Sequence, residues 1–310
     1  MSSSKVSTSA PLLAAFAATK PLRTGSLIVS IFGDCIAPRG GVVWLGSLIQ
    51  VLEPLGISHR VVRTAAYRLV QDGILINEQR GRESYYSLTE NGRREFDEAT
   101  ARIYALPEDE WDGEWCLVFT HGLPVEARQE VRRDLAWLGF GQLNSDTLAH
   151  PNLDQARLLL HLDRLQVRDR CLVFRGNLEA TAPDLDAQVI VDSWNLAGLE
   201  QAYGAYIDQF APILKSVRKQ NSLDPEDAFY IRTFMIHEYR KTLLRDPKLP
   251  EQLLPRSWKG HTAYQLTREL YRLVVLPSEQ FVDTAMRNEV GGLRPPGKSF
   301  FTRFGGLITE

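Results

Sequence analysis

Apolar residues in the first hundred positions recur at the three- and four-residue spacing of amphipathic helices. An apolar segment over residues 26–36 ends before Pro38, and a second helix over residues 43–55 is stopped by Gly56. A third helix is predicted over residues 58–70, because it opens on a serine, a residue that commonly caps helix starts. The two helices that flank the glycine therefore form a helix-turn-helix pattern.

Two short strands follow, over residues 74–79 and 84–88. The residues between them are Arg80-Gly81-Arg82-Glu83, which suit the tight turn of a hairpin. Thr89 then caps a charged helix that runs to about residue 104. Three helices followed by a basic hairpin is the order of a winged helix-turn-helix.

The polar face of the third predicted helix combines arginine with threonine and tyrosine. Residues 58–71 hold three arginines and no acid, a local charge of +3. Such a helix can enter the major groove and reach base edges, while hairpin arginines suit the minor groove or flanking phosphates. The residues expected to contact DNA are Ser58, His59, Arg60, Arg63, Thr64, Tyr67, Arg68, Arg80, Arg82, Ser84 and Tyr86.

Other roles remain open for these arginines. Taken alone, the set also fits a solvated helix face. Arg63 and Arg68 could instead turn inward, pair with Glu53, Asp72 or Glu83, and brace the domain.

After residue 104 the pattern changes to alternating strands and helices. Residues 106–114 contain five acids and no base, which indicates an exposed linker. Strands are then predicted over residues 115–120, 140–143, 147–150 and 171–175, with helices over 124–138 and 153–165. This βαββαβ order is the split ferredoxin-like pattern.

The last third is predicted to be helical. One helix covers residues 199–219, the next is capped by Asp224 with Pro225 at its first position, and the third covers residues 262–275. After Glu279 the chain is expected to form a loosely attached tail.

Cations gather on the second of these helices and in the proline-rich loop that follows it. Beside two aromatic residues they could hold a phosphorylated ligand with an aromatic portion. The alternative is a solvated helix face with a packed tryptophan. The candidate ligand-binding residues are Arg232, His237, Tyr239, Arg240, Lys241, Arg245, Arg256, Trp258 and Lys259, with Lys248 in the same loop.

Composition narrows the classes of protein. The chain of 310 residues is 44% hydrophobic and 24% charged, with no apolar run long enough to span a bilayer, which excludes a membrane channel or a disordered scaffold. Its net charge of −2 argues against a protein that coats nucleic acid. Because the helix over residues 58–71 carries +3, DNA contact through one small face stays compatible with that total.

No catalytic, cofactor or metal site is predicted. The chain lacks a Gly-x-Ser-x-Gly elbow, a phosphate-binding loop and a dinucleotide fingerprint, and its six histidines show no paired ligand spacing. Cys35, Cys116 and Cys171 lie far apart in apolar contexts, so we expect core residues of a reduced, cytoplasmic protein. The apolar stretch over residues 12–18 resembles a weak signal peptide, but a disordered tail is favoured.

These patterns divide the chain into an α+β series of segments. They are a disordered tail (1–21), a winged helix-turn-helix domain (22–104), an acidic linker (105–114), a ferredoxin-like domain (115–192), a helical C-terminal domain (193–280) and a C-terminal tail (281–310).

From about Leu22 to Asp283 the sequence resembles the repressors of phenylacetic acid degradation operons, the PaaX-type regulators. The segments that carry the resemblance are VVWLGSLIQVLEPLGISHRVVRTAAYRLVQDGIL (42–75), GRESYYSLTENGRREF (81–96), WDGEWCLVF (111–119), RRDLAWLGFGQL (132–143) and RDPKLPEQLLPRSWKGHTAYQLTRELY (245–271). A winged helix alone is common, whereas this three-part series is specific.

The resemblance implies a homodimeric, cytoplasmic repressor that binds a palindromic operator and is released by phenylacetyl-coenzyme A. It places the recognition helix on residues 58–70 and the wing on residues 80–86, and it implies a Cas2-like middle domain. Cas2-like nucleases carry an aspartate after their first strand, where this chain has Phe119-Thr120-His121. Two other classes stay open, a metal-dependent nuclease with an appended DNA-binding module and a DNA-binding protein without a ligand.

Overall fold

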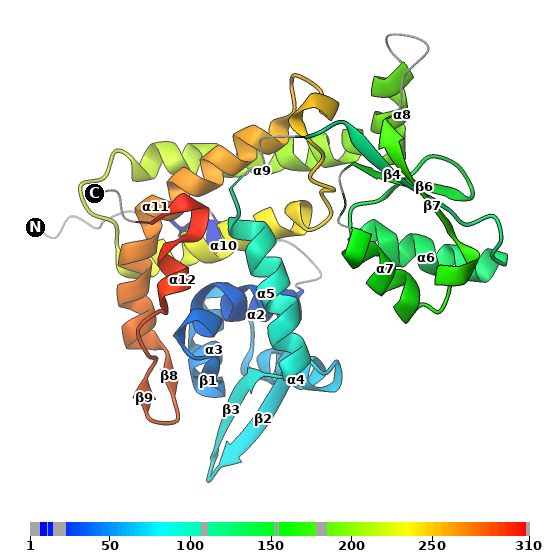
Figure 1. Cartoon of the computed structure of the whole chain (residues 1–310). Helices are drawn as coiled ribbons and strands as arrows, with labels where there is room; N and C mark the ends of the chain where they lie inside the picture. The colour runs from blue at the N-terminus through cyan, green and yellow to red at the C-terminus, as the bar shows by residue number, and fades with distance from the viewer. Residues whose placement is uncertain are drawn as a thin grey trace, which may run out of the picture. The chain divides into compact units, whose positions relative to one another are not determined.

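The computed structural model describes residues 7–10, 12–14, 23–106, 111–151, 153, 155–177 and 185–307. These residues form two compact units (Figure 1). The first unit draws on Met1–Leu106, Tyr206–Lys241 and Thr262–Glu310, and the second on Pro107–Ala205 and Thr242–His261. The long C-terminal helices thus contribute to both units, which differs from the separate helical domain predicted over residues 193–280.

The first unit begins with the predicted helices and hairpin. Its elements are α2 (Thr24–Ile31), a π-helical turn (Phe32–Ile36), a 3-10 turn (Ala37–Arg39), β1 (Val42–Trp44), α3 (Leu45–Leu52), a 3-10 turn (Glu53–Leu55), α4 (His59–Gln71), β2 (Leu75–Arg80), β3 (Glu83–Leu88) and α5 (Glu90–Tyr104). The strands form an antiparallel sheet in the order β1-β3-β2. Strand β1 was not predicted, because its residues read as the start of the following helix.

Two glycines allow the turn before α4 and the turn of the β2–β3 hairpin. Gly56 has a φ of 71° between the 3-10 turn and α4, and Gly81 has a φ of 63° at the tip of the β2–β3 hairpin. Left-handed backbone of this kind carries no steric cost for glycine. The buried face of α4 carries Val62, Ala66 and Leu69, which leaves its polar face outward.

The second unit is built on a four-stranded antiparallel sheet. Its elements are β4 (Glu114–Phe119), α6 (Val125–Trp137), β5 (Gly141–Gln142), β6 (Thr147–Pro151), α7 (Gln155–Arg164), a 3-10 turn (Arg168–Arg170), β7 (Leu172–Asn177), α8 (Leu185–Ser193) and a 3-10 turn (Glu251–Leu253). The strand order β5-β6-β4-β7 confirms the predicted ferredoxin-like pattern.

Helices α6 and α7 cover one face of this sheet (Figure 1). Cys116 and Val118 of β4 point toward them and pack with Val131, Leu135 and Leu158 in one buried cluster. Alternate residues of β4 therefore serve this core, as the period of two in a strand requires. The exposed Leu172 and Phe174 of β7 pair with Phe119 and Leu117, so they lie on the sheet face away from these helices.

Three long helices follow, α9 (Leu196–Val217), α10 (Pro225–Leu243) and α11 (Lys259–Ala285). Helix α11 is longer than predicted and contains Pro277. Helix α10 is a core element of the first unit: its residues from Ala228 to Ile236 are all buried, with Arg232 among them. Its cations were predicted either to hold a phosphorylated ligand or to form a solvated helix face, and the second alternative is wrong for Arg232 and His237, because both side chains are buried.

The segment after α11 is part of the first unit. It contains β8 (Arg287–Asn288), β9 (Gly291–Gly292), α12 (Lys298–Phe301) and a 3-10 turn (Arg303–Gly305). Phe300, Arg303 and Phe304 are buried, so the prediction of a loosely attached tail is wrong for residues 281–307. Arg303 donates a hydrogen bond to Asp34, and the Phe304 ring packs against Tyr104.

Part of the predicted N-terminal tail is also packed. Ser7 and Ser9 donate hydrogen bonds of 2.6 and 2.5 Å to Asp227, and Leu12 is buried. The other residues of the predicted tail over 1–21, including most of the apolar stretch, lie outside the described part of the chain.

Candidate nucleic-acid interface

The outward face of α4 carries every residue that the sequence selected there. Ser58, His59, Arg60, Arg63, Thr64, Tyr67 and Arg68 are all exposed. Arg63 and Thr64 lie three and four residues after Arg60, and Tyr67 lies four and three residues after them, which places all four on one side of the helix. Tyr67 is 60% exposed.

Local contacts at the start of α4 involve few of these side chains. The Thr64 hydroxyl donates a 2.9 Å hydrogen bond to the Arg60 carbonyl, and His59 Nε2 lies 3.6 Å from Glu53 Oε1. Ser58 has the extended backbone of an N-cap, but its hydroxyl makes no capping bond. The sequence was right about where the helix begins, although the predicted cap contact is not formed.

The inward pairing of Arg63 and Arg68 is not observed. Glu53 contacts His59, and Glu83 is paired with Arg287. Among the described residues no carboxylate forms an ion pair with either arginine, and both guanidinium groups remain on the exposed face. The α4 face therefore presents cations that are available to an anion such as a phosphate.

The β2–β3 hairpin adds two more exposed cations. Arg80 and Arg82 flank Gly81 at its tip, and Arg80 Nε donates a 2.9 Å hydrogen bond to Glu78. Ser84 is half-buried. Tyr86 was predicted to contact DNA but is 6% exposed, because it pairs with both Asn77 and Val43 in the middle strand of the sheet.

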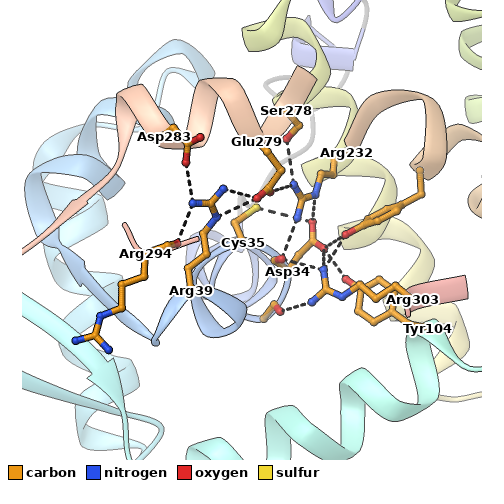
Figure 2. A network of polar contacts seen from close by, with 12 residues as sticks. Asp34, Cys35, Arg39, Tyr104, Arg232, Ser278, Glu279, Asp283, Arg294 and Arg303 are labelled. Atoms are coloured by element: carbon orange, nitrogen blue, oxygen red, sulfur yellow. Dashed lines mark hydrogen bonds and ion pairs between the residues drawn. The ribbon is translucent and has the colours of Figure 1, made fainter. Parts of the chain in front are cut away.

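The first unit also contains a buried charge cluster (Figure 2). Asp34 accepts hydrogen bonds from Arg232 Nε at 2.7 Å, Arg303 Nη1 at 2.8 Å and the Tyr104 and Tyr271 hydroxyls at 2.6 and 2.8 Å. Burial alone would raise the pKa of Asp34, but the two guanidinium groups outweigh it and lower that pKa. Asp34 therefore stays charged inside the core.

The same cluster extends to a third arginine. Arg232 also contacts Glu279, Arg39 donates to Glu279 at 3.0 Å and to Asp283 at 2.7 Å, and Arg39 is 3% exposed. Three guanidinium groups thus face three carboxylates. Sequence reasoning missed this cluster, although a lone acid in the apolar segment SIFGDCI is a signal that a buried partner exists.

The candidate ligand-binding residues do not form one site within either unit. Arg232, His237, Tyr239, Arg240 and Lys241 belong to the first unit, whereas Arg245, Arg256, Trp258 and Lys259 belong to the second.

In the first unit, internal contacts occupy most of the candidate set. His237 and Ser30 share a 2.8 Å hydrogen bond, and Arg240 donates to Ser30 at 2.7 Å and to the Ser26 carbonyl at 2.8 Å. Burial, together with the nearby charges of Lys241 and Arg240, lowers the pKa of His237 to about 3. Tyr239 is 2% exposed, and Lys241 donates to Glu238 at 2.7 Å.

In the second unit the loop cations remain at the surface. Arg245, Lys248, Arg256 and Lys259 are exposed. Trp258 is 6% exposed and packs edge-on against Tyr203 with ring centroids 5.7 Å apart, which agrees with the alternative of a packed tryptophan.

A cavity of about 710 Å³ lies in the first unit beside the N-terminal segment. Its polar lining includes Ser9, Asn221, Asp224, Glu226 and Asp227. Among the described residues the lining holds carboxylates and no cation, which does not suit a phosphorylated ligand. This cavity is therefore a poor place for a coenzyme A ester.

Other sequence expectations concern metals, membranes and cysteines. Within the described ranges no three metal-binding side chains converge, and no helix there combines the length and hydropathy of a bilayer span. Thr120 follows β4 and donates to the Asp146 carbonyl at 3.0 Å. Cys35 and Cys116 are buried as predicted, whereas Cys171 is partly exposed, and all three thiols are free.

Three family models match the chain in succession. They are described as PaaX-like protein (residues 23–92), PaaX protein central Cas2-like domain (108–188) and PaaX-like protein C-terminal domain (194–284). A curated relative, the transcriptional repressor PaaX of Escherichia coli (strain K12), is 37% identical over 292 residues, which are 94% of this chain and 92% of the relative. A solved structure of an uncharacterized protein from Mycobacterium tuberculosis is 20% identical with a TM-score of 0.49, and the match covers 76% of this chain and 89% of that one.

Proposed function

The chain belongs to the PaaX-like protein family, and from this premise we propose that it is a DNA-binding transcriptional repressor. The curated relative is a transcriptional repressor, which is a regulator and not an enzyme. The observation that carries the proposal for this chain is the exposed face of α4, whose arginines have no acidic partner among the described residues. A cytoplasmic location follows from the proposal, because the operator is there.

The first unit acts in this proposal as a winged helix-turn-helix. Helix α4 lies in the major groove, where Arg63, Tyr67 and Arg68 reach base edges and phosphates. The β2–β3 hairpin is the wing, and Arg80 and Arg82 at its tip reach the minor groove or the flanking phosphates. The order α3, turn, α4, hairpin and the exposure of these side chains support the assignment.

A homodimer is part of the proposal, since a palindromic operator requires two copies of the reading helix. Support comes from β7, which is an edge strand of its sheet. Leu172 and Phe174 on this strand are 63% and 48% exposed. An exposed apolar edge strand favours pairing with a second chain.

Phenylacetyl-coenzyme A is the proposed effector, and this part rests on the family resemblance. The exposed loop cations Arg245, Arg256 and Lys259 of the second unit supply charges suited to its phosphates. Release requires the effector to bind the DNA-free state of the protein more tightly than the DNA-bound state. Changing DNA occupancy from 99:1 to 1:99 takes a difference of about 5.5 kcal/mol in effector binding between these two states.

A selection followed by a titration tests the proposal. The purified chain is incubated with a randomised duplex library, and the recovered duplex is used in gel shifts with phenylacetyl-coenzyme A, phenylacetate and coenzyme A in parallel. We expect one palindromic sequence to be recovered and the thioester alone to release it. Recovery of no preferred sequence would contradict DNA reading, whereas a stable complex in all three titrations would contradict the effector. Cleavage of the duplex with added divalent metal would favour the nuclease alternative.

A further inference from the structure

The β8–β9 hairpin lies beyond the last residue that the family models match, which is residue 284. It nevertheless lies against β1 of the three-stranded sheet (Figure 1). The hairpin is short, with two residues in each strand, and its turn residue Val290 is 78% exposed. A segment this small buries few apolar side chains, so its attachment to the sheet depends on specific polar and stacking contacts.

Arg287 of β8 makes these contacts. Its guanidinium forms a two-pronged ion pair with Glu83, with Nη1 3.4 Å from Oε2 and Nη2 on Oε1. The same group lies 3.8 Å above the Trp44 ring, and the Arg287 backbone N–H donates to Ser47 Oγ at 3.1 Å. One residue thus joins β1, the start of α3 and the hairpin β2–β3.

Glu83 lies beside the turn of the β2–β3 hairpin, so its ion pair with Arg287 restrains that hairpin. It is the first residue of β3 and pairs with Arg80 across the turn that carries Gly81. Tyr85 donates a 2.5 Å hydrogen bond to the same carboxylate. Hydrogen bonds from Arg287 and then Tyr85 lower the pKa of Glu83, so the ion pair persists at neutral pH.

The rest of the C-terminal segment holds Arg287 in place. The Arg294 carbonyl accepts a 3.0 Å hydrogen bond from Arg39, and Gly297 N donates to the Pro38 carbonyl at 2.9 Å. Further along, Arg303 is fixed on Asp34 in the buried charge cluster (Figure 2). A two-stranded hairpin is weak in isolation, and β8–β9 is secured at these points instead.

We propose that Arg287 is a positioning residue for DNA binding, a role that rests on the proposed function. Its ion pair with Glu83 and its stacking on Trp44 fix the direction of the β2–β3 hairpin, so that Arg80 and Arg82 meet the duplex together with α4. The C-terminal hairpin is then a working part of the DNA-reading unit.

A direct contact between Arg287 and a phosphate is the competing role, and two measurements separate them. Loss of a phosphate contact alone leaves hydrogen exchange in the β2–β3 hairpin unchanged, whereas loss of the positioning contacts makes that exchange faster. Glu83→Gln separates the roles by sign. Removing an acid beside DNA strengthens binding electrostatically, but releasing the hairpin weakens it.

The experiment uses the full chain and the duplex that the wild-type protein selects from a randomised library. Gel-shift affinities are measured at several salt concentrations for Arg287→Ala, Arg287→Lys, Glu83→Gln and the double variant Arg287→Ala/Glu83→Gln. Arg294→Ala is the matched control, since it removes an exposed cation of the same segment. Thermal unfolding and hydrogen exchange of residues 75–88 are recorded for each variant.

We expect Arg287→Ala and Glu83→Gln each to weaken binding about fivefold, with faster hydrogen exchange in the hairpin. The double variant should lose no more than either single one, and Arg287→Lys should recover part of the affinity because it keeps the ion pair without the planar stacking. Arg294→Ala should bind as the wild type does.

Wild-type affinity in Arg287→Ala, tighter binding by Glu83→Gln, or unchanged hydrogen exchange of the hairpin in Arg287→Ala would each overturn the positioning role while leaving the proposed function intact. A wild-type chain that selects no DNA would overturn both.

Discussion

At the scale of single residues, the open question about Arg63 is whether its side chain contacts a DNA base or a phosphate of the DNA backbone. Its guanidinium is exposed in the middle of the α4 stripe and has no carboxylate partner within the described residues. A bidentate contact with guanine uses this geometry, and so does a phosphate contact. The two differ in whether the loss on substitution depends on the DNA sequence.

We predict that Arg63→Ala weakens binding to the selected duplex by about 1–3 kcal/mol and relaxes the preference at one base position. Gel shifts with singly substituted duplexes measure both effects. Arg93→Ala in α5 is the control, because it removes an exposed arginine from the same unit. An equal loss on every duplex would instead identify Arg63 as a phosphate contact.

Predictions for single residues were correct where helical periodicity determines which side chains are exposed. They were wrong where a contact with a residue far away in the sequence determines whether a side chain is buried. The α4 face was predictable, since apolar residues at helical spacing fix which side is buried. Arg232 was not, because its partner Asp34 lies 198 residues away in sequence. Tyr86 was wrongly predicted to contact DNA for a related reason. Strand β1, which was not predicted, pairs with the strand that carries Tyr86.

At the scale of elements, the sequence identified nearly every helix and strand through residue 177, with most boundaries shifted by one or two residues. The exceptions are informative. Strand β1 is three residues long, too short to show a period of its own, and Pro277 lies inside α11 rather than beyond its end. The β8–β9 hairpin was missed because Asn288 and two glycines carry no strand signal.

Strand β7 makes a prediction at this scale. A charge on its exposed apolar edge blocks pairing with a second chain, so Leu172→Lys/Phe174→Lys should convert a dimer into a monomer in sedimentation experiments. Affinity for a two-half-site duplex should fall while affinity for a single half-site stays unchanged.

Leu160→Lys is the control for β7, since Leu160 is 69% exposed on α7 of the same unit. If the double variant sediments as the wild type does, the dimer uses another surface.

At the scale of the whole molecule, the net charge of −2 conceals an uneven distribution. The +3 of residues 58–71 faces outward, while three further arginines are neutralised inside the charge cluster of Asp34. A buried ion pair is costly to break, because one charge is then left without a partner. Total charge therefore says little about where this chain meets DNA.

The buried His237 makes the free energy of unfolding depend on pH. The pKa of His237 falls from 6.5 to about 3 on burial, so the folded state holds the neutral imidazole while the unfolded state takes up a proton. The free energy of unfolding is therefore unaffected by His237 protonation above pH 6.5, and it decreases as the pH falls toward 3. We predict a loss of roughly 2 kcal/mol from this residue between pH 6.5 and 4.5.

Urea unfolding of the wild type and His237→Gln at several pH values measures that loss. The variant should be less stable at neutral pH yet lose less stability on acidification, because glutamine takes up no proton. His261→Gln, at an exposed position, should keep the wild-type dependence. Identical slopes in all three proteins would show that other groups govern acid unfolding.

The bond between Asp34 and Arg303 joins residues 269 positions apart. During synthesis Asp34 leaves the ribosome long before Arg303 exists, so the buried carboxylate lacks one of its two neutralising guanidinium groups until Arg303 has been made. A nascent chain that stops before Arg303 would therefore carry an incompletely neutralised charge in the core of the first unit. The order of synthesis thus places the completion of this core after the synthesis of α4 and the β2–β3 hairpin.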